Sequence, residues 1–158
     1  MQEAGPSEPE AGPTSEAALP TTFDSFPIDP EIREAIAEMG YVTPMEVQCR
    51  VVKDALEGRD IVVQSMTGSG KTTAFGIPLV QRLAADTAGP REPHALALVP
   101  TRELATQVAA EVGLLSKNKG VRVHPVYGGV SIGQQVQAFE AGVEIVVATP
   151  GRLLDHIR

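Results

Sequence analysis

Short apolar runs alternate along the chain with longer segments in which apolar residues recur every three or four positions. Short runs rich in β-branched residues and bounded by turn residues are typical of buried strands, whereas the longer repeat is typical of amphipathic helices. Strands that are mostly apolar and alternate with helices indicate a parallel sheet with helices on both faces. The pattern therefore predicts an α/β fold with strands at 61–63, 95–99, 121–126 and 144–148.

Capping residues mark the ends of the predicted helices. The pair Asp29-Pro30 is typical of a helix start, and that helix should end at Gly40. The sequence Thr-Pro-Met-Glu at 43–46 has the form of a capping box with Pro44 at the first helical position, which predicts a second helix from there to about Gly58. Further helices are expected from about Lys71, at 103–116, at 131–140 and from about Pro150.

The first 22 residues differ in composition from the rest. They are rich in Pro, Gly, Ala, Ser and Thr, contain four Glu, and include no Lys, Arg or aromatic residue. Such a segment cannot bury enough apolar surface to offset the entropy that ordering would cost. We expect residues 1–22 to be a disordered acidic tail.

Composition narrows the class of protein. The net charge is −7 and four of the acidic residues lie in the tail, so the remainder lacks the basic excess of a protein that holds nucleic acid by bulk charge. Any such contact must therefore be local. The one cysteine, Cys49, excludes an intramolecular disulfide and fits a reducing cytosol. No apolar run approaches the ~18 residues of a membrane span, so we expect a soluble, cytoplasmic protein with no membrane partner.

The sequence Gln-Ser-Met-Thr-Gly-Ser-Gly-Lys-Thr at 64–72 follows a predicted strand and opens a predicted helix, which is the context that a phosphate-binding loop requires. Gly68 and Gly70 allow backbone N–H groups to converge on an anion, and the helix start adds further donors. Lys71 would supply a positive charge to the β- and γ-phosphates, and the Thr72 hydroxyl would be a ligand for Mg²⁺. The alternative is a Gly/Ser turn followed by an ordinary lysine.

The strict phosphate-loop pattern begins with Gly, but Ser65 stands in that position. A small residue followed by x-T-G-S-G-K-T resembles the loop of the DEAD-box RNA helicases of superfamily 2, in which the first residue is usually Ala. Ser for Ala is a small-for-small change that should leave the loop intact. The resemblance implies that ATP and Mg²⁺ bind here, with Lys71 and Thr72 taking part in catalysis. The phosphate ligands that it implies are Ser65, Thr67, Gly68, Ser69, Gly70, Lys71 and Thr72.

The sequence from Gly40 to Gln48 resembles the Q motif of the same family, and Phe23 lies where the family places an isolated upstream aromatic residue. The amide of Gln48 offers an acceptor and a donor that match the N6 amine and N7 of adenine. Guanine presents two acceptors on that edge, so the site should disfavour GTP. Tyr41 is expected to stack on the base, with Phe23 supporting this corner. Taken alone, Gln48 would be an ordinary surface residue of a helix.

Three further motifs follow in the order of the family. Pro-Thr-Arg-Glu-Leu-Ala at 100–105, with Gln107, matches PTRELAxQ; the Gly pair after Tyr127 resembles the GG motif, and 149–152 the TPGR motif. In the family these loops grip the backbone of single-stranded RNA, because glycines and helix starts bring N–H groups to phosphate oxygens whatever the base sequence. Each motif alone is better explained as a cap or a turn, so the resemblance to the family depends on the occurrence of all three in the same order. The implied RNA contacts are Pro100, Thr101, Arg102, Gly128, Gly129, Thr149, Gly151 and Arg152.

The resemblance extends from Phe23 to the end of the chain. It implies a Q-motif helical region at 23–58 and a RecA-like P-loop NTPase domain from 59 to 158 that is incomplete at its C-terminus. The D-E-A-D and S-A-T motifs and the second RecA-like domain with its arginine finger do not occur in this sequence. Such a finger is worth ~10³–10⁵ in rate. We therefore expect weak ATP binding and negligible turnover by this chain.

The parent protein implied by the resemblance is an ATP-dependent RNA helicase that remodels single-stranded or short duplex RNA together with its second RecA-like domain. In the family, strands beyond residue 158 complete the sheet beside the phosphate-loop strand, so we expect this chain to expose a strand edge and to be prone to aggregation. Two alternatives stay open. One is a binding module that holds nucleotide or RNA without turnover, and the other is an unrelated phosphate-loop ATPase or kinase.

Overall fold

A computed structural model describes residues 19–83 and 92–158, so most of the predicted acidic tail lies outside the described residues. Three parallel strands form the sheet in the order β1–β3–β2, with Ala95 and Val123 both opposite Ile145. The strands are β1 (Ala95–Leu98), β2 (Val123–Val126) and β3 (Ile145–Ala148). Because the strands are parallel and in register, the loops that follow their carboxyl ends lie at one edge of the sheet. Three of the four predicted strands and their parallel arrangement are confirmed.

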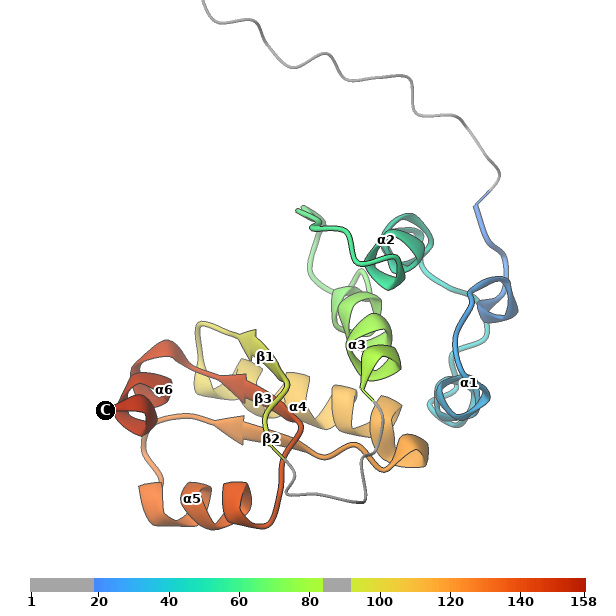
Figure 1. Ribbon diagram of the computed structural model, residues 1–158. Coiled ribbons are helices and arrows are strands. Elements are labelled where there is room, and N and C mark those ends of the chain that lie inside the picture. The colour runs from blue at the N-terminus through green and yellow to red at the C-terminus, as the bar shows by residue number, and fades with distance from the viewer. Residues whose placement is uncertain (1–18, 84–91) are drawn as a thin grey trace, which may run out of the picture.

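Helices cover both faces of the sheet, as predicted (Figure 1). They are α4 (Arg102–Ser116), α5 (Ile132–Glu140) and α6 (Pro150–Ile157). All four residues of β3 are buried, and alternate side chains enter different clusters because a strand has a side-chain period of two. Ile145 and Val147 pack with α4, whereas Val146 and Ala148 pack with side chains of α5 and α6. The continuous apolar run of β3 therefore reflects burial on both faces.

The segment before the sheet is mainly helical, and a short turn follows α4. The elements are η1 (Phe23–Ser25), α1 (Pro30–Glu38), α2 (Glu46–Leu56), α3 (Lys71–Arg82) and η2 (Lys117–Lys119). None of the helices in the described part of the chain is long and apolar enough to cross a membrane. Ile36, Val52 and Ile77 are at most 1 % exposed and join the cluster that contains Ile145. The helical region and the sheet therefore share this core. Burial of each such side chain contributes about 1.5–3 kcal/mol to the free energy of folding.

A hydrogen-bonded cluster ties the start of α1 to α3 and η2. The Asp29 N–H donates to Gln81 Oε1 at 2.8 Å, and Gln81 Nε2 donates to Asp29 Oδ1 at 2.9 Å. Lys119 Nζ donates to Asp29 Oδ2 at 2.7 Å. These donors, Lys119 first and Gln81 second, lower the pKa of Asp29 below its ordinary value because they stabilise the carboxylate. Asp29 precedes the first residue of α1, as predicted, and also connects three elements.

The predicted strand at 61–63 is wrong. Residues 59–66 form no regular secondary structure, and Val62 is completely exposed. A strand needs a neighbour for its backbone N–H and C=O groups, and none of the described strands pairs with this segment. The apolar run alone indicates a strand, but the pairing decides whether one forms.

The second predicted helix begins at Glu46 rather than at Pro44. Its N-cap is Met45, whose N–H donates to Gln48 Oε1 at 2.8 Å. The predicted capping box is therefore shifted by two residues, because Gln48 and not Glu46 reaches back to the cap. Glu46 instead forms an exposed ion pair with Arg50.

Candidate functional site

The glycine-rich loop lies at the N-terminus of α3. Gly68 and Gly70 have φ values of +76° and +83°, in the left-handed region where glycine meets no steric penalty. Gly70 is the N-cap of α3, so the N–H groups of Lys71 and Thr72 belong to the first turn, whose donors have no partner within a helix. Such donors, together with the positive end of the helix dipole, form an anion site.

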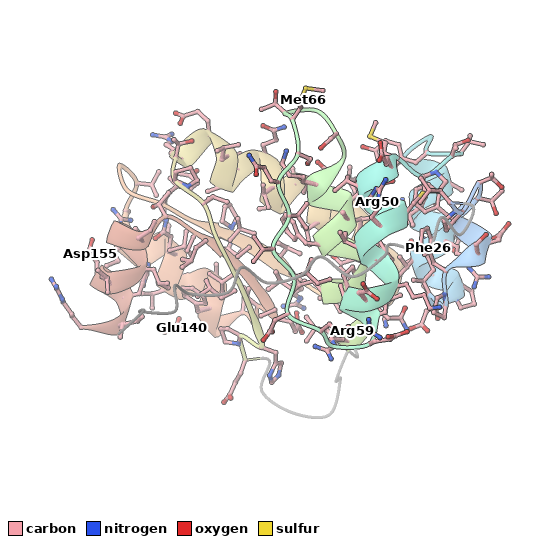
Figure 2. All side chains as sticks on the ribbon, turned by 90° about the horizontal axis from the view of Figure 1, so that it is seen from above. Phe26, Arg50, Arg59, Met66, Glu140 and Asp155 are labelled. Atoms are coloured by element: carbon pink, nitrogen blue, oxygen red, sulfur yellow. The ribbon has the colours of Figure 1, made fainter. Side chains whose placement is uncertain are left out.

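Lys71 turns back into the loop that precedes it. Its Nζ donates hydrogen bonds to the carbonyl oxygens of Ser65 at 2.8 Å and Met66 at 2.5 Å. The hydroxyls of Ser65 and Ser69 are 2.8 Å apart and share a hydrogen bond, so Ser65 adds a contact across the loop that Ala could not make. Met66 lies at the outermost point of the loop (Figure 2) and is 85 % exposed. An entering phosphate would give the ammonium group charged oxygens in place of neutral carbonyls, which is a stronger interaction.

A cavity of about 420 Å³ adjoins this loop. Its walls come from the loop, from the start of α3, from the segment around α2 and from one face of α4. Seven of the residues predicted to bind nucleotide line it, and they are Tyr41, Gln48, Thr67, Gly68, Gly70, Lys71 and Thr72. Phe23 does not line the cavity; it is 6 % exposed, packs against Phe26, and lies with Tyr41 at a neighbouring depression. Phe23 thus lies outside the cavity but shares a depression with Tyr41, while Ser65 and Ser69 bond to each other within the loop.

Gln48 connects α2 to the loop. It is 3 % exposed, and its Nε2 donates to the Gly70 carbonyl oxygen at 3.2 Å. Glycine at position 70 is favoured by its φ of +83°, and a Cβ atom there would lie 2.5 Å from Gln48 Nε2 and would displace that amide. A primary amide has two N–H groups and an oxygen with two lone pairs. After the bonds to Gly70 and to the Met45 N–H, Gln48 keeps one donor and one lone pair, which is the set that adenine requires.

One face of α4 lines the same cavity with Leu104, Gln107 and Glu111, none of which is among the nucleotide ligands predicted from the motifs. Their spacing of three and four residues places them on one side of a helix, and that spacing is the signal that could have found them. Thr73 Oγ1 donates to Glu111 Oε1 at 2.7 Å, which fixes α3 against α4. Because α4 begins at Arg102, it also reaches the second predicted site.

The cavity offers few protein ligands for a metal ion. Among the described residues, no group of three or more His, Cys, Asp or Glu could hold a metal. Of the described residues that line the cavity, Glu111 is the one carboxylate, and it accepts a hydrogen bond from Thr73. Mg²⁺ commonly binds through one or two carboxylates together with phosphate oxygens and water, and in phosphate loops a Ser or Thr hydroxyl is also a ligand. The Thr72 hydroxyl beside the loop fits that mode of binding.

The second predicted site lies at the carboxyl ends of the three strands. Thr101 is the N-cap of α4, and its Oγ1 accepts a hydrogen bond from the Leu104 N–H at 3.2 Å. The Arg102 guanidinium lies over the Tyr127 ring, 5.0 Å from its centroid, which is a cation–π contact. This contact joins the loop after β1 to the loop after β2. Pro100, Thr101 and Arg102 are all exposed.

The glycines of this site differ in what the fold requires of them. Gly129 has a φ of +86°, and a Cβ there would lie 3.4 Å from Arg102 Nη1. Gly128 and Gly151 have no positive φ, and a Cβ at either would meet nothing within 4 Å. The left-handed backbone conformation therefore explains Gly129, whereas neither conformation nor packing explains Gly128 or Gly151. Open space beside a glycine backbone is what close approach of a ligand needs.

The loop after β3 completes the site. Thr149 is the N-cap of α6, and its N–H donates to the Val126 carbonyl oxygen at 2.8 Å. Arg152 turns inward, with a side chain that is 12 % exposed, and its Nη1 donates to the Val130 carbonyl oxygen at 2.9 Å. The contacts of Arg102 and Arg152 therefore bring the loops that carry the eight predicted RNA contacts together at one edge of the sheet.

Comparison with known proteins gives a consistent family. The DEAD/DEAH box helicase family model matches residues 45–158. The chain is 41 % identical over 138 residues to the DEAD-box ATP-dependent RNA helicase CshA of Bacillus licheniformis, covering 86 % of this chain and 27 % of that protein. It is 43 % identical over 141 residues to the ATP-dependent RNA helicase DeaD of Buchnera aphidicola, covering 89 % of this chain and 23 % of that protein.

A solved structure is similar as well. The crystal structure of a DEAD box protein from the hyperthermophile Methanococcus jannaschii matches with a TM-score of 0.81 and 38 % sequence identity. That match covers 88 % of this chain and 37 % of the other. The chain thus spans about a quarter of the length of the curated relatives that it matches.

Proposed function

This chain belongs to the DEAD/DEAH box helicase family, and on that basis we propose that it is the part of an ATP-dependent RNA helicase that binds ATP and the backbone of single-stranded RNA. The observation that carries the proposal is the meeting of the glycine-rich loop with Tyr41 and Gln48 at one cavity of about 420 Å³. A helix start that gathers N–H donors next to a side-chain amide suits a molecule with phosphates at one end and a purine at the other.

In the proposed complex the phosphates of ATP lie in the loop at 65–72. Lys71 leaves the carbonyls of Ser65 and Met66 and binds the β- and γ-phosphates, while the first N–H groups of α3 hold phosphate oxygens. The Thr72 hydroxyl is a ligand for Mg²⁺, and the ion, when bound, neutralises charge on the β- and γ-phosphates. The remaining loop residues, Ser65, Thr67, Gly68, Ser69 and Gly70, shape the loop around the phosphates.

The adenine lies against Tyr41 and Gln48 in this proposal. Tyr41 is 40 % exposed at the cavity and stacks on the ring, and Phe23 supports it from behind. The remaining donor and lone pair of Gln48 meet N7 and the N6 amine. Guanine offers two acceptors at this edge, so GTP leaves the Gln48 lone pair without a donor.

RNA binds at the second site through its sugar-phosphate backbone. Exposed Thr101 and Arg102 reach phosphate oxygens, Pro100 shapes the start of α4, and Gly128, Gly129 and Gly151 let the strand approach the protein backbone. Thr149 and Arg152 hold the start of α6 beside it. Contacts to the backbone make binding independent of base sequence, with the 2′-OH distinguishing RNA from DNA.

The helix α4 connects the two sites. It begins at Arg102 in the RNA site, and Leu104, Gln107 and Glu111 on the same helix line the nucleotide cavity. The two proposed sites therefore share one helix. Turnover and strand separation belong to the whole protein, in the cytoplasm, with a second RecA-like domain facing these two sites.

For the 158 residues themselves, binding without turnover is the second candidate. Among the described residues that line the cavity, Glu111 is the one carboxylate, and its Oε1 accepts a hydrogen bond from Thr73, so at most its second oxygen is left to activate water. The test is ATP hydrolysis by this chain and by the complete protein, each with and without single-stranded RNA. The helicase proposal expects RNA-stimulated hydrolysis by the complete protein and negligible hydrolysis by this chain. Hydrolysis that ignores RNA in the complete protein, with equal affinity for ATP and GTP, would indicate an unrelated phosphate-loop ATPase.

A further inference from the structure

One polar side chain of α5 is buried. Gln135 is 3 % exposed, whereas Gln134, Val136 and Gln137 on the same helix are exposed. A buried amide without hydrogen-bond partners costs about 1–3 kcal/mol, and an apolar residue of similar size would fill the same space without that requirement. The contacts of Gln135 therefore need a reason beyond packing.

Both ends of the Gln135 amide are used. Its Nε2 donates to the Tyr127 carbonyl oxygen at 3.0 Å, and its Oε1 accepts from Arg152 Nη1 at 3.2 Å. His156 Nε2 lies 2.8 Å from the same Oε1. A carbonyl oxygen only accepts and a guanidinium only donates, so the orientation of the amide is determined and His156 must be the donor in its contact.

These contacts converge on the loop at 128–131, which contains the Gly pair. Gln135 holds the carbonyl of Tyr127, immediately before the loop, and Arg152 holds the carbonyl of Val130 near its end. Arg152 is itself held by Gln135. Arg152 Nε is buried and makes no hydrogen bond among the described residues, although Asp155 Oδ2 lies 3.7 Å from it as an ion pair, so the hydrogen bonds of the guanidinium are the two made by Nη1.

We propose that Gln135 is a positioning residue for RNA binding, which fixes the Gly128-Gly129 backbone through Tyr127 and Arg152. The proposal rests on the proposed function of this surface. A loop of two glycines has many accessible conformations, and ordering it on binding would cost affinity. Gln135 and Arg152 hold the loop in one conformation before RNA arrives. Arg152 thus contributes to RNA binding by holding the Val130 carbonyl, in addition to any direct contact with RNA.

The test is a double-mutant cycle on RNA affinity. Gln135→Leu, Arg152→Ala and the double variant are compared with the parent chain in binding to a fluorescein-labelled oligouridylate at low salt, by fluorescence anisotropy. Gln135→Met is a second variant of similar length in case Leu does not fold, and Gln134→Leu, on the exposed face of α5, is the matched control. Thermal melting and affinity for a fluorescent ATP analogue report whether the fold and the other site are intact.

We expect each single substitution at Gln135 or Arg152 to weaken RNA binding by about tenfold, and Gln135→Leu to add clearly less than its own effect of about tenfold once Arg152 is Ala, because of its contacts to the loop only the one with Tyr127 then remains to be lost. Gln134→Leu should bind like the parent, and affinity for the ATP analogue should be unchanged in every variant. If Arg152→Ala weakens RNA binding but Gln135 variants do not, or if the two effects are additive, the positioning role is refuted. If the parent itself does not bind the oligouridylate, the proposed function of this surface fails instead.

Discussion

The two proposed sites of this chain are both built from loops, but the fold holds them in different ways. The RNA site stands on three paired strands, and side chains such as Arg102 and Arg152 join one loop to the next. The nucleotide loop follows a segment at 59–66 that pairs with no described strand, and its main internal contacts come from Lys71 and from the Ser65–Ser69 hydrogen bond.

The two sites therefore differ in how firmly neighbouring elements hold their loops before a ligand binds. The RNA site is fixed before its ligand arrives, which lowers the entropy cost of binding a flexible strand. The nucleotide loop closes on its own lysine, so ATP must replace contacts that Lys71 already makes. Local stability should therefore be high in the sheet and low between Arg59 and Met66.

The largest expected effect is in amide hydrogen exchange. Amides of β3, bonded on both sides and buried, should exchange about a thousandfold more slowly than those of residues 61–66, because the first open only with the core and the second open locally. Exchange read residue by residue by NMR checks this difference. Equal protection of the two segments would mean that 59–66 is paired in solution, contrary to the comparison.

A pair of isoleucines measures the same contrast in stability. Ile145→Ala, at a fully buried position in β3, should lower the free energy of unfolding by about 2–5 kcal/mol. Ile61→Ala removes the same atoms from a residue that is 38 % exposed and should cost less than about 1 kcal/mol. Urea unfolding followed by circular dichroism gives both values. Similar losses for the two variants would show that 61–63 shares the core.

The lysine of the loop should affect one site only. Lys71→Ala is expected to reduce ATP affinity by about a hundredfold or more, since it removes the charge that meets the phosphates. The melting temperature and the affinity for oligouridylate should stay unchanged. Titration with a fluorescent ATP analogue measures the loss, and Lys53→Ala, at an exposed position of α2, is the control. Unaltered ATP affinity in Lys71→Ala would remove the loop from the nucleotide site.

Substitutions of Gln48 test whether this side chain recognises adenine. Gln48→Ala should weaken ATP by about tenfold and narrow its preference over GTP, because the variant loses the amide that faces adenine and the hydrogen bond to Gly70. Gln48→Glu keeps acceptance from the Met45 N–H but cannot donate to Gly70 or to N7. Competition between ATP and GTP for the same fluorescent analogue gives the preference. An unchanged ratio in both variants would place the purine elsewhere.

The smallest effect concerns pH and the joint between α1, α3 and η2. The folded-state pKa of Asp29 is depressed, so its contribution to stability is fully present above its unfolded value of about 3.9 and is lost as pH falls through the folded pKa. Because the Asp29 side chain is 41 % exposed, the contribution should stay under about 1 kcal/mol. Asp29→Asn should reduce the fall in unfolding free energy below pH 4. A steeper fall of the unfolding free energy in Asp29→Asn would mean that the pKa of Asp29 is not depressed in the folded protein.

Much of the fold is predictable because it depends on local signals. Pro30 and Pro150 at helix starts, Thr101 as a cap, and the apolar run of β3 act through their own neighbours in sequence. The segment 61–63 has an equally apolar sequence, but a strand exists only with a partner, which no local pattern reports.

The candidate sites divide in the same way. The motif residues, from Tyr41 to Arg152, are marked by their order along the chain. Gln135 has no such mark, because it is one of several similar residues on a helix and only the tertiary contacts of Tyr127 and Arg152 distinguish it. A buried polar network of this kind is visible only once the elements are packed.

The most direct test of the account is a titration of the ¹⁵N-labelled chain with a non-hydrolysable ATP analogue and Mg²⁺, followed by NMR. We expect amide shifts at Thr67–Thr72, Tyr41 and Gln48, with the loop at 128–131 unaffected. Shifts at 128–131 without any at Tyr41 and Gln48 would contradict it, because the nucleotide would then lie in the site assigned to RNA.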